Sequence, residues 1–257
     1  MPIRKPTLEE WFLIYQLKKA GPSHFHLPFT LEADVSRIAA AFAGTGKSVP
    51  WTPILVKAAG ILLEQYPVMN RAVFSTVFGL RFLEPDKIAV NMPIMIRDGE
   101  RGHLVAMSVQ EPHTKTLQQI REEIQKSAGR KKEETLIGKY VFGKPNHVFN
   151  RLRLKIIYFM STNFPKLHLK FGAGGICVSS LLNVHDGVTD MNIQAYGHTG
   201  FTVGASSVVK RDGKTILRLG MAYDHLAFFG EEAVRGTNIF AAILRGEDEK
   251  TFQRLIT

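Results

Sequence analysis

The residues best suited to chemistry lie near the C-terminus, where His225 follows Asp224 at the end of a predicted strand. Gly230 opens a predicted helix a few residues later. An imidazole at a strand end can reach a pocket, and because it titrates near neutral pH it can accept a proton from a thiol. His225 is therefore the candidate general base. The alternative is a purely structural role, which is common for a single histidine.

A second candidate is the predicted strand that ends in Ser179 and Ser180, after the glycine-rich residues 172–175. A serine hydroxyl in such a place can donate a hydrogen bond to an oxyanion. The same strand holds Cys177, the only cysteine of the chain. A single cysteine excludes an internal disulfide and a zinc site built from cysteines.

Two further patterns resemble binding sites but have simpler explanations. The run Gly44 to Ser48 lacks the glycine that a phosphate loop needs five positions before its Gly-Lys pair, because Ala41 stands there. It is predicted to be a helix end and a turn. His24 and His26 alternate on a predicted strand, so they share one face. Without acidic or cysteine partners nearby, they are expected to line a pocket or support the structure, and no metal site is predicted.

Bulk composition restricts the classes of function. The chain has 257 residues, of which 45% are hydrophobic and 22% charged, and a formal net charge of +10. A basic surface favours anionic partners such as nucleic acid, acidic lipid or a phosphorylated ligand like coenzyme A. The aromatic residues are not interleaved with lysine and arginine as in a stacking groove, so nucleic acid is not the expected partner. With no signal-peptide core and no run of about 18 apolar residues, a cytoplasmic protein is predicted.

Hydrophobic periodicity predicts helices and strands without regular alternation, which favours a single α+β or mixed α/β domain over residues 1–257. Residues 135–170 are the least regular part and are interpreted as an insertion. Their basic amphipathic stretch at 150–160 fits a packed surface element, a lid or interface helix, or, as a less favoured reading, membrane contact through 150–170. The predicted helices are 7–20, 32–42, 54–66, 113–132 and 231–244, and the predicted strands are 24–31, 71–96 with a turn at 84–86, 104–110, 175–181, 201–209 and 215–223.

Three segments have the order and spacing of motifs from one family. The helix that starts at Thr52-Pro53 ends in a Pro-x-x-Asn sequence at 67–70, and residues 174–181 have a Gly-x-x-x-x-Ser form. The run from Asp224-His225 to Gly230 is similar to the signature Asp-His-Arg-x-x-Asp/Asn-Gly. Together they resemble the catalytic domain of the acyltransferase component of 2-oxoacid dehydrogenase complexes, related to chloramphenicol acetyltransferase. The resemblance spans almost the whole chain except about 135–170.

This resemblance implies a mixed sheet covered by helices, with the active site at the interface of a homotrimer and a higher-order cage as a further possibility. His225 would take the proton from the thiol of coenzyme A or dihydrolipoamide, and Ser179 of a neighbouring subunit would stabilise the oxyanion. Asp224, Ser180, His24 and Gly230 would support or line the site. Coenzyme A or acyl-CoA would be a substrate, with no metal and no covalently attached lipoate, since no lipoyl or subunit-binding module is recognised. Leu255-Ile256 are candidates for cage contacts.

Two positions depart from the family signature. Leu226 stands where the signature has arginine, and Phe229 stands where it has Asp or Asn. A phenyl ring has no hydrogen-bond donor or acceptor, so it cannot replace the polar group. The sequence therefore allows two leading hypotheses: a thiol-dependent acyltransferase with an unusual site, or a catalytically impaired relative that serves as an oligomeric scaffold. A third and less favoured hypothesis is a basic protein that binds nucleic acid or a membrane surface.

Overall fold

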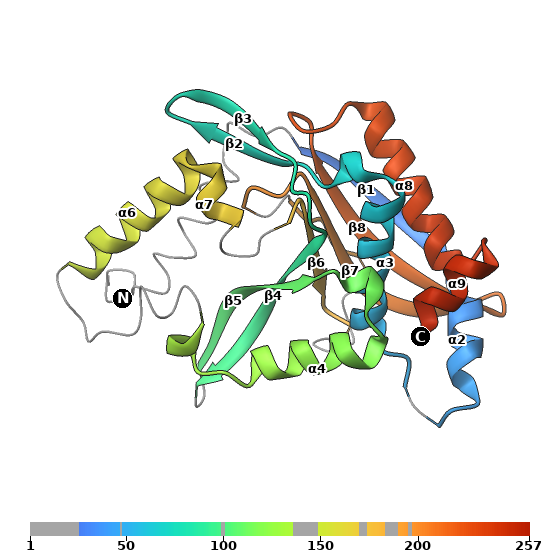
Figure 1. Cartoon of the computed structure of the whole chain (residues 1–257). Helices are drawn as coiled ribbons and strands as arrows, with labels where there is room; N and C mark the ends of the chain where they lie inside the picture. Colours follow the sequence, from blue (N-terminus) through green and yellow to red (C-terminus); the bar gives the residue numbers. More distant parts are fainter. Residues whose placement is uncertain are drawn as a thin grey trace, which may run out of the picture.

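A computed structural model describes residues 26–46, 48–98, 101–135, 149–169, 174–182, 190–194 and 197–257. Within them the main element is a six-stranded mixed sheet (Figure 1). Its short strand β6 pairs in parallel with both neighbours, and the other strand pairs are antiparallel. The order across the sheet is β1 (His26–Asp34), β8 (Lys214–Asp224), β7 (Phe201–Arg211), β6 (Ile176–Ser180), β4 (Ala89–Asp98) and β5 (Arg101–Gln110).

One face of this sheet is covered by three helices. α8 (Gly230–Arg245) packs on β1, α3 (Trp51–Gln65) on β4 and β6, and α4 (Leu117–Ala128) on β4 and β5. The side chains of α3 are buried from Pro53 to Leu63, so this helix is the centre of the core. The sheet and its helices confirm the predicted α+β class. The other helices of the described residues are α2 (Ser36–Ala43), α6 (Asn150–Asn163), α7 (Pro165–Leu169), α9 (Glu249–Ile256), η1 (Pro67–Met69), η2 (Pro112–Thr114) and η3 (Lys132–Glu134).

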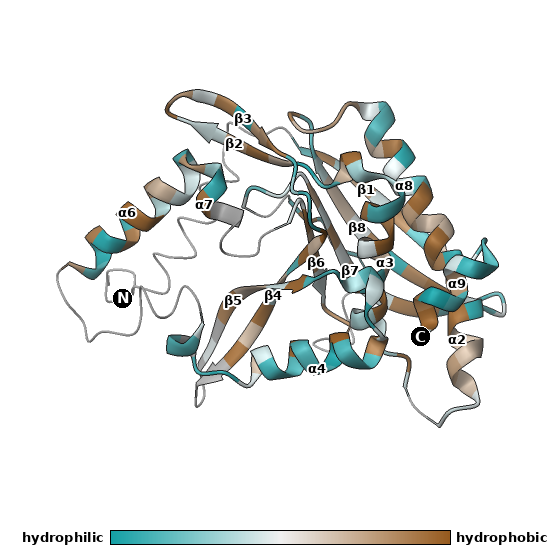
Figure 2. Cartoon of the chain, viewed as in Figure 1, coloured by the Kyte–Doolittle hydropathy of each residue, from teal (hydrophilic) through white to brown (hydrophobic). Residues whose placement is uncertain are grey.

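A separate hairpin projects from the sheet. It consists of β2 (Ala72–Thr76) and β3 (Gly79–Leu83), joined by the turn Val77-Phe78. In Figure 1 it lies near α6, and the ribbon of both elements is brown at their hydrophobic residues in Figure 2. The predicted strand region 71–96 is thus confirmed. It contains β2, β3 and most of β4, whereas the single turn predicted at 84–86 implied two strands.

Alternation along the strands gives the sheet two different faces. Ile176 and Val178 of β6 face the helices and belong to the core, so Cys177 and Ser179 face the opposite side, which we call the outer face. Segment 190–194 packs against this outer face. A Cβ at position 220 would lie 1.9 Å from the carbonyl oxygen of Met191, so only glycine fits at position 220.

Several predicted boundaries were wrong. β1 continues to Asp34, where a helix was expected from residue 32, because Glu32 and Ala33 pair with β8. The Asp34 carboxylate then accepts hydrogen bonds from the Ser36 amide and hydroxyl at the start of α2. Gly44 ends α2 and Gly46 has a positive φ of 67°, which confirms the helix end and turn predicted there. The predicted helix 7–20 and His24 lie outside the described residues, and α9 was not predicted.

Candidate active site

A tight turn after β8 presents His225 at the surface. The amides of Ala227 and Phe228 both donate to the carbonyl oxygen of Asp224, at 2.8 and 3.1 Å. The Asp224 carboxylate is buried and accepts from the Leu226 amide at 2.9 Å. These bonds hold the backbone on both sides of His225, whose side chain is exposed. Asp224 therefore shapes the loop that carries the imidazole.

The protonation pattern of His225 follows from one contact. Its Nδ1 lies 3.0 Å from the carbonyl oxygen of Phe228. A carbonyl can only accept a hydrogen bond, so Nδ1 of the neutral ring carries the proton. This leaves the lone pair on Nε2, which is the form that a general base needs.

Phe229 and Gly230 lie at the start of α8. The Phe229 amide donates to the Glu232 carboxylate at 2.9 Å, while its ring is 76% exposed in the single chain. Gly230 has no atom within 4 Å of the place where a Cβ would be, and its φ is not positive. Neither the fold nor the turn thus requires glycine at this position within one chain.

Arg71, which the sequence did not single out, anchors the same loop from the other side. Its Nη1 donates to the carbonyl oxygen of Ala227 at 2.7 Å, and its guanidinium forms an ion pair with Glu84. The backbone oxygen of Arg71 accepts from the Gly200 amide at 3.1 Å. Because Ala227 is two residues from His225, Arg71 fixes the position of the candidate base. No local pattern could indicate this contact, since Arg71 and Ala227 are 156 positions apart in the sequence.

Two buried asparagines hold the strand that carries Ser179. Asn70 Oδ1 accepts from the Gly175 amide at 3.1 Å, and Asn91 bonds both the amide and the carbonyl of Gly174. A Cβ on Gly174 would lie 1.8 Å from the carbonyl oxygen of Ala89, so only glycine fits there. The Pro-x-x-Asn sequence noted above thus ends in a residue that positions β6.

The two candidate serines point in opposite directions. Ser179 shares the outer face with Cys177, and its hydroxyl has no hydrogen-bond partner within the described part of the chain. Ser180 faces the helix side, where its buried Oγ also lacks a hydrogen-bond partner among those residues. Burial raises the pKa of the Cys177 thiol to about 12, so this thiol is not a nucleophile near neutral pH.

Within one chain, Ser179 and His225 are far apart. Ser179 pairs with Gly204 of β7, and Gly204 pairs with Gly220 of β8, five residues before His225. Two strand spacings and five residues along a strand correspond to a separation on the order of 20 Å. A single subunit therefore brings together Asp224, His225, Phe229 and Gly230, but not the serines.

Two findings on the described residues concern metal clusters and membrane-spanning helices. No cluster of three or more histidine, cysteine, aspartate or glutamate side chains there could hold a metal ion. None of the helices in these segments is long and apolar enough to cross a bilayer.

Comparisons with known proteins rest on structure, because no family model matches the chain and no curated protein matches its sequence. The dihydrolipoamide acetyltransferase of Azotobacter vinelandii superimposes with a TM-score of 0.68 at 17% identity, over 98% of this chain and 94% of that one. The cubic core of a pyruvate dehydrogenase multienzyme complex gives 0.65 at 16% identity, over 98% and 94%. A chloramphenicol acetyltransferase gives 0.50 at 14% identity, over 95% and 96%.

The chain has the fold of these acyltransferases. The resemblance read from the motifs is thereby confirmed at the level of the fold, across nearly the entire length. The Azotobacter protein was studied for the catalytic roles of a serine, a histidine and an asparagine. In its numbering the histidine and the asparagine are four positions apart, the same spacing as His225 and Phe229.

Proposed function

We propose that this protein is an acyltransferase that moves an acyl group between thiols, with His225 as the general base. The observation that carries the proposal is the bond from Nδ1 of His225 to the Phe228 carbonyl, which leaves Nε2 as the basic nitrogen on an exposed loop. The acyltransferase fold supports the reaction class. Coenzyme A, whose phosphates suit a chain with net charge +10, is the proposed thiol substrate.

The proposed reaction has two stages. Nε2 of His225 accepts the proton of the thiol, and the thiolate attacks the carbonyl carbon of an acyl thioester. The resulting oxyanion accepts a hydrogen bond from Ser179. When the tetrahedral intermediate collapses, the original carbon–sulfur bond breaks, and the leaving thiolate takes the proton back from His225. Charge and protons balance without a metal ion or an oxidant.

We further propose that the site forms between subunits of a homotrimer. Ser179 is too far from His225 within one chain, and the imidazole and Phe229 are exposed when the chain is alone. The cubic core among the structural neighbours supports assembly of this fold into larger particles. Leu255, however, is completely buried in its own chain, so it is not available for the cage contacts expected of it.

The alternative is a scaffold subunit with little or no activity. Phe229 favours it, because a phenylalanine stands four residues after His225, the same spacing at which the Azotobacter enzyme has an asparagine after its histidine. Leu226 removes a second polar side chain of the signature, and in this chain the bond from residue 226 to the Asp224 carboxylate comes from the backbone amide. In this alternative the chain would assemble but would not exchange acyl groups.

The test is acyl exchange between acetyl-CoA and a second thiol, followed by mass spectrometry of both thioesters. We expect exchange by the native protein and a loss of about 10²–10⁴-fold in His225→Ala. Ser179→Ala is expected to cost about 10²–10³-fold. Ser180→Ala is the matched control on the same strand. No exchange by the native protein would favour the scaffold, and a loss confined to Ser180→Ala would move the oxyanion role to that serine.

A further inference from the structure

One surface remote from the His225 loop in sequence combines exposed apolar side chains with positive charge. It is formed by the β2–β3 hairpin with α6 and α7, that is, by residues 76–83 and 149–166, and we call it the α6–hairpin surface. The Val77 amide donates to Asn163 Oδ1 at 2.7 Å, so the hairpin turn contacts the C-terminal end of α6. Figure 1 shows these elements together at the side of the molecule opposite to α8 and α9.

Most of the large exposed apolar side chains belong to this surface. The hairpin turn exposes 67% of Phe78, and the residue before α6 exposes 61% of Phe149. Exposed apolar patches of this kind usually mark an interaction site. Ten of the fourteen such side chains in the described residues lie here: Val77, Phe78, Leu80, Phe82, Phe149, Leu152, Ile156, Phe159, Met160 and Phe164.

On α6 these side chains form one stripe. Leu152, Ile156 and Phe159 recur at helical spacing, while Leu154 is buried against the protein. Arg151 and Lys155, four residues apart and both exposed, lie along one side of the stripe. The helix therefore presents an apolar face edged with positive charge, the pattern of helices that lie in a membrane interface.

Along the sequence, the segment that contains this helix carries charge of one sign. Between Glu134 and Asp186 the sequence contains seven lysines and arginines but no acidic residue. This segment therefore supplies seven of the ten excess positive charges of the chain. A symmetric contact between two copies would bring these like charges together, which disfavours a second copy as the partner. Anionic phospholipid matches both the sign of the charge and the apolar stripe.

We propose that the α6–hairpin surface binds peripherally to bilayers that contain anionic phospholipid. The apolar stripe and the hairpin turn enter the headgroup region, and the lysines and arginines contact the lipid phosphates. This inference does not depend on acyl transfer, since it concerns none of the residues proposed for that reaction. It would hold equally for an enzyme and for a scaffold.

The first test is co-sedimentation of the full chain with vesicles at low salt. We expect binding to vesicles of phosphatidylcholine with about one third phosphatidylglycerol, and little binding to phosphatidylcholine alone. Lys155→Gln combined with Lys166→Gln is expected to weaken binding about fivefold per charge. The control with the same change in net charge is Lys210→Gln with Lys250→Gln, exposed lysines on β7 and α9. Added salt should weaken binding by the native protein.

The second test concerns the apolar stripe. Ile156→Gln with Phe159→Gln should abolish sedimentation with anionic vesicles, whereas Met95→Gln with Leu104→Gln, exposed on β4 and β5, should leave it unchanged. Three results of these vesicle experiments would overturn the proposal. They are no binding of the native protein to anionic vesicles, equal binding to neutral vesicles, and a loss of binding in a control variant equal to that in its test variant. A fourth is a change in the mass of the protein in solution caused by the stripe variant without any vesicle binding, which would identify a second copy as the partner.

Discussion

The chemistry proposed for His225 depends on the loop that holds its ring. Nδ1 is fixed by the Phe228 carbonyl, and the backbone of that loop is fixed by Asp224 and by Arg71. A histidine on a mobile loop would exchange between its two neutral forms. The three contacts together favour the one form in which Nε2 can accept a proton from a thiol.

At position 229 a single substitution distinguishes an unusual enzyme from an impaired one. Phe229→Asn introduces an amide that can support the loop or the oxyanion, as a hydrogen-bond donor at such a site is worth about 10²–10³-fold in rate. We expect the variant to exchange acetyl groups faster than the native protein. The measurement is kcat for acyl exchange, with Phe159→Asn as the control on another exposed phenylalanine. Unchanged exchange would mean that an amide at this position contributes nothing to the reaction, and slower exchange would mean that the phenyl ring is part of the working site.

Arg71 is expected to act as a positioning residue. Arg71→Ala removes the donor to the Ala227 carbonyl, so the loop loosens and kcat for exchange falls about tenfold, with a smaller effect on KM. Arg71→Lys should restore part of the rate, because its ammonium can still donate to that carbonyl. Arg81→Ala, on the hairpin that follows Arg71 in the chain, removes an arginine that bonds its neighbour Leu80 and should have no effect. A purely structural role would instead lower thermal stability without a rescue of kcat by lysine.

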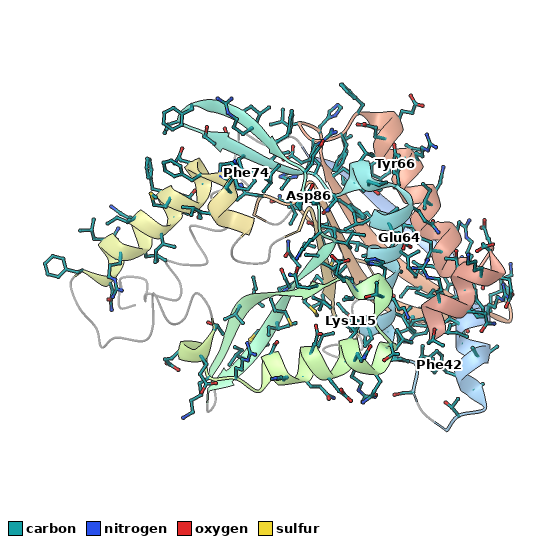
Figure 3. All side chains as sticks on the ribbon, in the orientation of Figure 1. Phe42, Glu64, Tyr66, Phe74, Asp86 and Lys115 are labelled. Carbon is teal, nitrogen blue, oxygen red and sulfur yellow. The ribbon has the colours of Figure 1, made fainter. Side chains whose placement is uncertain are left out.

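At the level of elements, Lys57 is a charge placed inside the central helix. Its side chain is 4% exposed, and desolvation, with a smaller effect of Arg254, lowers its pKa from 10.5 to about 8. Arg254 itself pairs with Glu64, which is labelled on α3 in Figure 3. Between pH 8 and 10.5 the unfolded chain binds more protons at this lysine than the folded chain does. The free energy of unfolding should therefore rise with pH across this window, by about 1–3 kcal/mol.

Lys57→Met tests this directly. The variant should be more stable than the native protein at pH 7, where the native lysine is charged and desolvated, and the difference should shrink as the pH approaches 10.5. Urea unfolding at both pH values measures it, and Lys250→Met, an exposed lysine on α9, provides the baseline. A constant difference between the two pH values would show that Lys57 has an ordinary pKa.

The two glycines near the site should respond in opposite ways. Gly174→Ala places a Cβ against the Ala89 carbonyl at 1.8 Å, so β6 must shift and stability should fall by about 3 kcal/mol or more. Gly230→Ala meets no atom within 4 Å at the start of α8, and should be neutral or stabilising by up to about 1 kcal/mol. Denaturant unfolding of the two variants compares them. Equal losses would mean that Gly230 meets a neighbouring subunit.

The elements that the sequence predicted well are those whose local pattern agrees with their packing. Thr52-Pro53 and the apolar run after them predicted α3, and the predicted strand 175–181 contains β6. Glu32 and Ala33 were assigned to a helix because nothing local opposes it, but pairing with β8 decides their conformation. Arg71 was missed for the same reason, since its partner lies far along the chain.

At the level of the whole molecule, the proposed site makes a prediction that no single-chain site can satisfy. If His225 of one subunit works with Ser179 of the next, a mixture of His225→Ala and Ser179→Ala subunits regains intact sites. A site is intact only when its histidine comes from a Ser179→Ala subunit and its serine from a His225→Ala subunit. With random mixing in a trimer this happens at about one site in four.

The experiment unfolds and refolds the two inactive variants together and measures acyl exchange. About one quarter of the native rate is expected from the mixture, and none from either variant refolded alone. Analytical ultracentrifugation of the same samples should show trimers, so that a failure to assemble is not mistaken for a failure of the site. Trimers that form from the mixture but stay inactive would place both residues in one chain, against the separation of about 20 Å that the strand register implies.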